Sequence, residues 1–308
     1  MAAEGPTMKW RAGRRTFACA IATLLATGQP TPAWTSDEAP AIETSLVLLT
    51  RETGSKGSGS KGSGSNSISR TSSSRSRGSL VERVVERGPE GLVLEYDLAQ
   101  PKSKRRGTDV WMFPARVRKA PGQDAVLLNE QAVAARLQDW LDRHPSLRPL
   151  CGRYVFTWTM FRIECDPQAV LEAIAPYDLH PGPLSVGMPY TEDDALEARP
   201  LRSAPGIEAG RGYTVTLSLD PEALRRTDLE VRAAALQVTR DGASALTEEM
   251  ERLKRSDYSG QRVVTFATDA AGRVSMRRRE TSIRIEKPDG SHETRTITEV
   301  VGRKPDQP

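Results

Sequence analysis

Apolar and hydroxyl side chains alternate strictly from Tyr213 to Leu219, and a strand with one buried and one solvated face has this pattern. Three more strands are expected near the end of the chain, because two turn sequences rich in Asp, Gly, Pro and Ser separate them. These strands cover Arg262 to Thr268, Arg273 to Lys287 and Glu293 to Val301. The pattern therefore predicts an antiparallel meander in this part of the chain.

Two helices are expected between the first strand and the meander. Asp220-Pro221 can cap and start the first helix, and Thr247 can cap the second. Apolar residues at helical spacing follow these caps, namely Leu224, Val231, Ala235 and Val238 in the first helix and Leu246, Met250 and Leu253 in the second. Residues 203–308 are therefore predicted to form one α+β module of a strand, two helices and a three-stranded meander.

The preceding region, residues 80–202, is predicted to form a first module of the same class. Two strand-like runs flank the turn Gly88-Pro89-Glu90-Gly91, which indicates a hairpin, and another strand is expected from Val110 to Val117. A helix is expected between Asn129 and Pro145. Its apolar stripe consists of Val133, Leu137, Trp140 and Leu141.

A second short helix of this module is expected after Asp166-Pro167, and it ends at Pro176. The chain from Tyr177 to Gly212 has no period of either kind, so we expect a solvated connection between the modules. The predicted fold class is α+β: two small modules, each an antiparallel sheet packed with two short helices, after a disordered amino-terminal tract.

The stretch from Cys151 to Cys165 is rich in aromatic side chains and is expected to be core. If it folds as a hairpin about Trp158, the two cysteines lie opposite each other, because they are equally far from that residue. An even cysteine count in an oxidising compartment favours pairing. We therefore predict a disulfide between Cys151 and Cys165, worth about 3 kcal/mol by chain entropy. Two reduced, buried cysteines are the alternative.

A block of basic residues precedes an apolar run from Phe17 to Ala26, which is the layout of a signal peptide. The basic residues are Lys9, Arg11, Arg14 and Arg15. A membrane-spanning helix needs about 20 apolar residues, and this run stops well short of that length at Gly28. We expect residues 1–33 to be removed as a signal peptide, with the cleavage site and the choice between general and twin-arginine export left open.

Residues 34–79 follow this signal and are rich in Ser, Gly, Lys and Arg from Thr53 onward. Such a tract buries too little apolar surface to offset the entropy of ordering it. We therefore predict a disordered linker between the signal and the first module.

Charge and composition narrow the classes of partner. The chain has 44 Lys and Arg residues against 40 Asp and Glu, and part of this excess lies in the signal and the linker. A nucleic-acid binder usually concentrates its basic residues on one face, so no nucleic-acid partner is expected. No segment after the signal is long and apolar enough to span a bilayer, so no integral membrane segment is expected after signal removal.

The sequence contains no recognisable catalytic or cofactor motif. Its histidines, His144, His180 and His292, are far apart, so no metal site is expected and each is interpreted as a surface or capping residue. The acidic residues from Glu192 to Glu197 match no calcium loop and are interpreted as solvated. Arg277-Arg278-Arg279 is interpreted as part of a solvated strand face, since neighbouring residues point to opposite sides. No catalytic residue, cofactor or metal ligand is assigned.

These observations favour an exported protein of the bacterial-type envelope, periplasmic or secreted, that acts as a non-catalytic binding or structural module. Its partner would be an envelope protein or polymer that the sequence does not identify. The alternative is an envelope hydrolase or transferase with a site near the aromatic residues 154–161.

Overall fold

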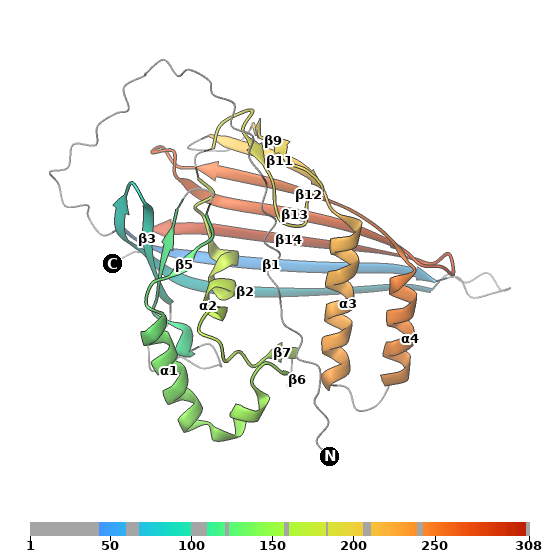
Figure 1. Cartoon of the computed structure of the whole chain (residues 1–308). Helices are drawn as coiled ribbons and strands as arrows, with labels where there is room; N and C mark the ends of the chain where they lie inside the picture. The colour runs from blue at the N-terminus through green and yellow to red at the C-terminus, as the bar shows by residue number, and fades with distance from the viewer. Residues whose placement is uncertain are drawn as a thin grey trace, which may run out of the picture. The chain divides into compact units, whose positions relative to one another are not determined.

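A computed structural model describes residues 43–59, 68–99, 110–120, 123–156, 160–182, 184–205, 211–238 and 243–305. Its main feature is one ten-stranded sheet in the order β10-β11-β12-β13-β14-β1-β2-β3-β4-β5, in which every neighbouring pair is antiparallel (Figure 1). The prediction of two small α+β modules is therefore wrong. Strands from both expected modules join one sheet, because β1 pairs with β14 on one side and with β2 on the other.

The strands of this sheet differ greatly in length. They are β1 (Glu43–Gly59), β2 (Ile68–Gly88), β3 (Gly91–Leu98), β4 (Ala115–Lys119), β5 (Val126–Leu127), β10 (Arg202–Ser203), β11 (Gly212–Ser218), β12 (Asp257–Thr268), β13 (Val274–Glu286) and β14 (His292–Pro305). Two short hairpins lie outside it: β6 (Tyr154–Phe156) with β7 (Met160–Arg162), and β8 (Pro189–Tyr190) with β9 (Arg199–Pro200). The predicted strand at 213–219, the hairpin around Gly88 to Gly91 and the closing meander are all confirmed.

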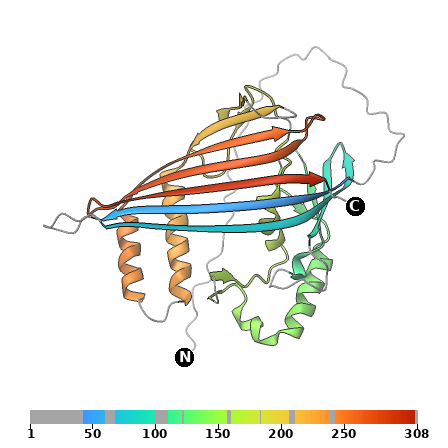
Figure 2. The same cartoon turned by 180° about the vertical axis from the view of Figure 1, so that it is seen from behind.

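The helices lie on one face of the sheet, here called the inner face, and Figures 1 and 2 show this face and its reverse. The helices are α1 (Glu130–Arg143), α2 (Ala169–Ile174), α3 (Pro221–Val238) and α4 (Ala243–Lys254), with 3-10 turns η2 (Val110–Met112), η3 (Pro145–Leu150) and η4 (Ala175–Tyr177). The four helices were predicted in these regions, but the prediction of Thr247 as a cap is wrong, since α4 begins at Ala243 and contains Thr247. The strand predicted at 110–117 begins instead as the turn η2, and pairing starts only at Ala115, after the cis-proline Pro114.

Three apolar clusters occupy the inner face. The first lies between β2 to β5 and the helices α1 and α2, around Trp111, which is 2 % exposed. The second lies beneath β1 and β11 to β14 and includes Leu179 and Leu201, both from the segment expected to be a solvated connection. That expectation is wrong because the apolar side chains of the segment are buried against the sheet. The third cluster joins α3 and α4 to the far ends of β12 and β13 around Leu253.

Strands β1 and β2 correct the prediction of a disordered linker for residues 43–59 and 68–79, the described part of the range 34–79. Seventeen residue pairs join them, from Glu43 opposite Val84 to Gly59 opposite Ile68. The low strand propensity of Ser and Gly is overridden here because β14 pairs with the other side of β1, and hydroxyl groups also bond across strands, as Thr53 Oγ1 does with Ser74 Oγ at 2.7 Å. Gly78 is required where it stands, since a Cβ there would lie 1.9 Å from the hydroxyl oxygen of Tyr177.

The aromatic stretch forms the predicted hairpin, and its register places Tyr154 opposite Arg162, which is symmetric about residue 158. The sulfur atoms of Cys151 and Cys165 lie 2.01 Å apart, at disulfide distance. The stretch is not uniformly core, however. Ile163 is buried, but Phe156 is 65 % exposed, because the hairpin projects from the core toward α3 instead of entering the sheet.

The predicted signal peptide, residues 1–33, lies outside the described residues. Within the described part of the chain, none of the helices has the length and apolar character needed to cross a membrane.

Candidate functional site

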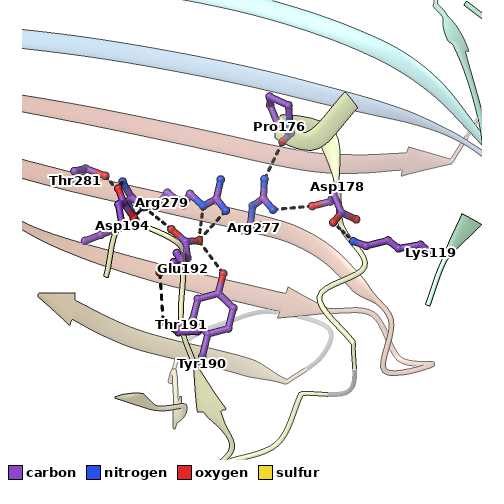
Figure 3. Close-up of polar contacts among 11 residues, drawn as sticks. Lys119, Pro176, Asp178, Tyr190, Thr191, Glu192, Asp194, Arg277, Arg279 and Thr281 are labelled. Carbon is purple, nitrogen blue, oxygen red and sulfur yellow. Dashed lines mark hydrogen bonds and ion pairs between the residues drawn. The ribbon is translucent and has the colours of Figure 1, made fainter. Parts of the chain in front are cut away.

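Residues 178–205 cross the inner face of the sheet and bring carboxylates to buried arginines (Figure 3). Glu192, whose side chain is 9 % exposed, accepts hydrogen bonds from Arg262 Nη1 at 2.5 Å and Arg279 Nε at 2.8 Å. Both carboxylate oxygens of Asp194 accept from Arg262 at 2.8 Å. The interpretation of these acidic residues as solvated is therefore wrong for Glu192 and Asp194, since the strands β12 and β13 place arginines directly beneath them, whereas Asp193 and Glu197 are exposed.

The pKa values show that this cluster is a closed set of ion pairs. Burial alone would raise the pKa of Glu192, but the charges of Arg279 and Arg262 hold it below its usual value. Burial also acts to lower the pKa of Arg262, yet Asp194 and Glu192 raise it. Each charge therefore has a bonded partner of opposite sign.

Arg277, two residues before Arg279 on the same face of β13, has a different environment. It is 7 % exposed and donates to two backbone carbonyl oxygens, those of Pro176 and Asp178, each at 2.8 Å (Figure 3). Burial, together with the charge of Arg279, lowers the pKa of Arg277 to about 10. The predicted solvated face at 277–279 is thus wrong for Arg277, because strand alternation leaves only Arg278 on the outer face.

Lys119, at the end of β4, is a second desolvated cation near Arg277. Its ammonium group contacts the Asp178 carboxylate. Burial and then the charge of Arg277 lower the pKa of Lys119 to about 8. Gly91 allows this arrangement, because it adopts a φ of +112° and a Cβ there would lie 2.2 Å from the carbonyl oxygen of Lys119.

A buried carboxylate, Glu82 on β2, anchors a third group of polar side chains. It is 1 % exposed and accepts hydrogen bonds from Tyr96 Oη at 2.9 Å and from Arg303 Nη2 at 2.7 Å. His180 Nε2 lies 3.1 Å from Glu82 and also 3.1 Å from Arg303. Burial would raise the pKa of Glu82, but the hydrogen bond and charge of His180, the charge of Arg303 and the hydrogen bond of Tyr96 lower it to about 2.

A cavity of about 640 Å³ opens beside these groups. Part of its wall is apolar, formed by Val84, Leu92, Leu179, Met188 and Val274. Another part is polar and basic, formed by Arg87, Lys119, His180, Arg273 and Arg303. None of the described residues that line the cavity carries a carboxyl, hydroxyl or thiol group. The combination of an apolar wall and several cations suits an organic anion.

The ring nitrogen His180 Nε2 either donates to Glu82 when it carries a proton or accepts from Arg303 when it does not, and Lys119 is paired with Asp178. Neighbouring side chains thus fix the positions of these two polar groups at the cavity. In these positions the groups can attract and orient a ligand. Within the described ranges, no three His, Cys, Asp or Glu side chains converge as metal ligands would.

The residues singled out from the sequence lie elsewhere. Cys151 and Cys165 fix the base of the β6–β7 hairpin, and no described residue of the 154–161 stretch lines the cavity. The interpretation of His180 as a surface or capping residue is wrong, since its side chain packs on buried Glu82. Arg277 and Arg279 belonged to a motif that the sequence analysis considered, and alternation along their strand was the available signal that both share one face.

The sequence matches no protein-family model and none of the curated proteins. Function is therefore inferred from the geometry of the site.

Proposed function

We propose that this protein is an exported, non-catalytic binding protein and that the cavity beside Lys119 and Arg303 holds a small organic anion with an apolar part. The observation that supports this most is the cavity itself, in which an apolar wall faces cations at a volume suited to a small molecule. An anion in the cavity would add to the contact with Asp178 in offsetting the burial of Lys119, which lines the cavity.

Binding is favoured over catalysis because two ionisable groups at the cavity, His180 Nε2 and the Lys119 ammonium group, already contact other protein side chains. A general base must reach the proton it abstracts, and His180 Nε2 lies instead between Glu82 and Arg303. Export is supported by the basic and apolar pattern of the first 26 residues and by the cysteine pair at disulfide distance, which an oxidising compartment would keep joined.

The test compares three probes of one length: octanoate, octanol and octylamine. Isothermal titration of the purified protein should detect octanoate, with octanol and octylamine at least about tenfold weaker, because each carries the apolar chain without the negative charge. The Lys119→Met variant should lose about tenfold in octanoate affinity, whereas Lys119→Arg should retain most of it. Octanoate binding should also weaken above about pH 8, where Lys119 loses its proton.

Lys254→Met is the matched control, since Lys254 is an exposed lysine on α4 paired with Glu251. Equal affinity for octanol and octanoate, or an unchanged affinity in Lys119→Met, would contradict the anion site. Recovery of the protein only from the cytosolic fraction with residues 1–33 still attached would contradict export.

A further inference from the structure

Half of strand β2 forms a free edge of the long sheet. Strand β1 pairs with β2 along its whole length, but β3 pairs only with the part from Leu80 to Gly88. No strand within the described residues pairs with the other side of residues 68–79, and Figure 2 shows this half of β2 as the outermost long strand there. The side chains from Thr71 to Arg77 are all exposed. An unpaired edge of this kind presents N–H and C=O groups that another strand can bind.

The side chains along this edge leave its backbone accessible. The segment Thr71-Ser72-Ser73-Ser74-Arg75-Ser76-Arg77-Gly78 has no proline and no large apolar residue. Four of its residues are serines, whose small side chains do not cover the backbone. Other described edges are shorter: β5 spans two residues and β10 spans two. The β2 edge is therefore the longest uncovered template among the described strands.

The charge of this edge is positive and lies on one face. Arg75 and Arg77 are two positions apart, so both point to the same face of the sheet. This is the outer face, because Leu80 and Val84 at the alternate positions of β2 are buried in the inner-face core. Arg75 bonds Glu52 of β1 at 2.8 Å, with both side chains more than half exposed. Arg77 lies opposite Thr50 and makes no ion pair with any described residue. A strand added beyond β2 would meet these arginines on its own outer face.

We propose that an extended acidic segment of a partner protein adds to the sheet along residues 68–79 of β2. Its backbone would continue the hydrogen-bonded ladder, and carboxylates at alternate positions would pair with Arg75 and Arg77 across the strands. A second copy of this chain fits less well, since pairing two such edges brings arginines close to arginines on the same face. This partner surface is separate from the cavity and does not depend on the proposed ligand.

Two synthetic peptides of twelve residues test the proposal with the full-length protein: one alternates Glu and Val, the other alternates Lys and Val. We expect the Glu peptide to bind and the Lys peptide to bind at least about tenfold more weakly. The double variant Arg75→Glu, Arg77→Glu should reverse this preference. The control Arg278→Glu changes an exposed outer-face arginine in the middle of the sheet and should leave it unchanged.

Proline substitutions separate strand addition from simple charge attraction. Neighbouring residues of an antiparallel strand direct their N–H groups to opposite sides, so one of Ser73→Pro and Ser74→Pro removes an outward donor while sparing the ladder with β1. The variant that retains the melting temperature should lose at least about tenfold in Glu-peptide affinity.

Failure of both peptides to bind, or binding that survives charge reversal and both prolines, would overturn the proposal. A concentration-dependent dimer that the same prolines abolish would also overturn it, because the occupant would then be a second copy.

Discussion

Two regions of the inner face contain buried arginines and carboxylates, and they differ in how their charges are balanced. Near α3 and α4, Asp228 pairs with Arg295 and accepts a hydrogen bond from Tyr258, and Glu293 also pairs with Arg295. Asp228 and Glu293 raise the pKa of Arg295 against the lowering effect of its burial. Burial lowers the pKa of Lys119, which lines the cavity, and of Arg277, which lies near Lys119 but does not line the cavity. The same residue types thus raise the pKa of a buried cation in one place, whereas in the other the pKa of buried cations is lowered although Lys119 contacts Asp178.

The difference indicates separate roles. Closed pairs, including those of Arg262 with Glu192 and Asp194, hold the crossing segment on the sheet. Cations with lowered pKa values beside a cavity are instead able to gain from an anionic ligand. Three measurements of stability test whether the two regions differ in this way.

The largest effect is expected from removing one partner of a closed cluster. Arg262→Met leaves Glu192 and Asp194 buried without that cation and should lower the free energy of unfolding by about 4 kcal/mol. Arg277→Met removes a desolvated cation bound only to carbonyl oxygens, so it should cost about 1 kcal/mol. Urea denaturation at pH 7 measures both. Equal losses of unfolding free energy in the two variants would contradict the distinction between the ion-paired arginine and the arginine bound to carbonyl oxygens.

An acid titration should show the next largest effect. The pKa of Glu82 is about 2 in the folded protein against 4.5 ordinarily, so the unfolded chain binds its proton first. The stabilisation from Glu82 is therefore complete above about pH 4.5 and is lost as the pH falls toward 2, a loss of about 3 kcal/mol. Glu82→Gln should remove this part of the slope when unfolding is followed across that range. An identical slope in the variant would show that Glu82 is not held ionised by His180, Arg303 and Tyr96.

An alkaline titration should show the smaller of the two pH effects, a gain in stability as the pH rises. The pKa of Lys119 is about 8 when folded and 10.5 ordinarily, so the unfolded chain keeps its proton at a pH where the folded chain releases it. Stability should rise by about 1.5 kcal/mol between about pH 8 and 9.5, since one fifth of the side chain still reaches solvent. Lys119→Met should flatten this rise, and Lys254→Met should not. A rise of the same size in Lys119→Met would assign it to another group.

The sequence was sufficient to predict local secondary structure but not the way in which the strands assemble into one sheet. Apolar spacing located the four helices, although the predicted cap Thr247 lies inside α4, and the turns at Asp269 to Gly272 and Pro288 to Ser291 located the meander. The serine-rich part of β1 and β2 has no apolar alternation to read, and its strand structure comes from partners on both sides. Pairing between segments about 250 residues apart leaves no local signal, so the single sheet was not foreseen.

The cavity was missed for the same reason. Lys119, His180 and Arg303 come from three distant parts of the chain, and each is unremarkable in its own sequence context. Only the register that sets Arg303 beside Val47, and Val47 opposite Leu80, brings them around Glu82. No spacing rule within one segment could have grouped them.

The position of β1 between β2 and β14 has a consequence for how the protein comes to be folded. Leu46 of β1 is paired with Lys304 of β14, so β1 can complete its pairing only after β14 has been synthesised. A chain still on the ribosome lacks residues 292–305 and leaves one side of β1 without its neighbour. Completion of the sheet must therefore follow synthesis of residues 292–305, and until then long strands remain exposed to wrong pairing.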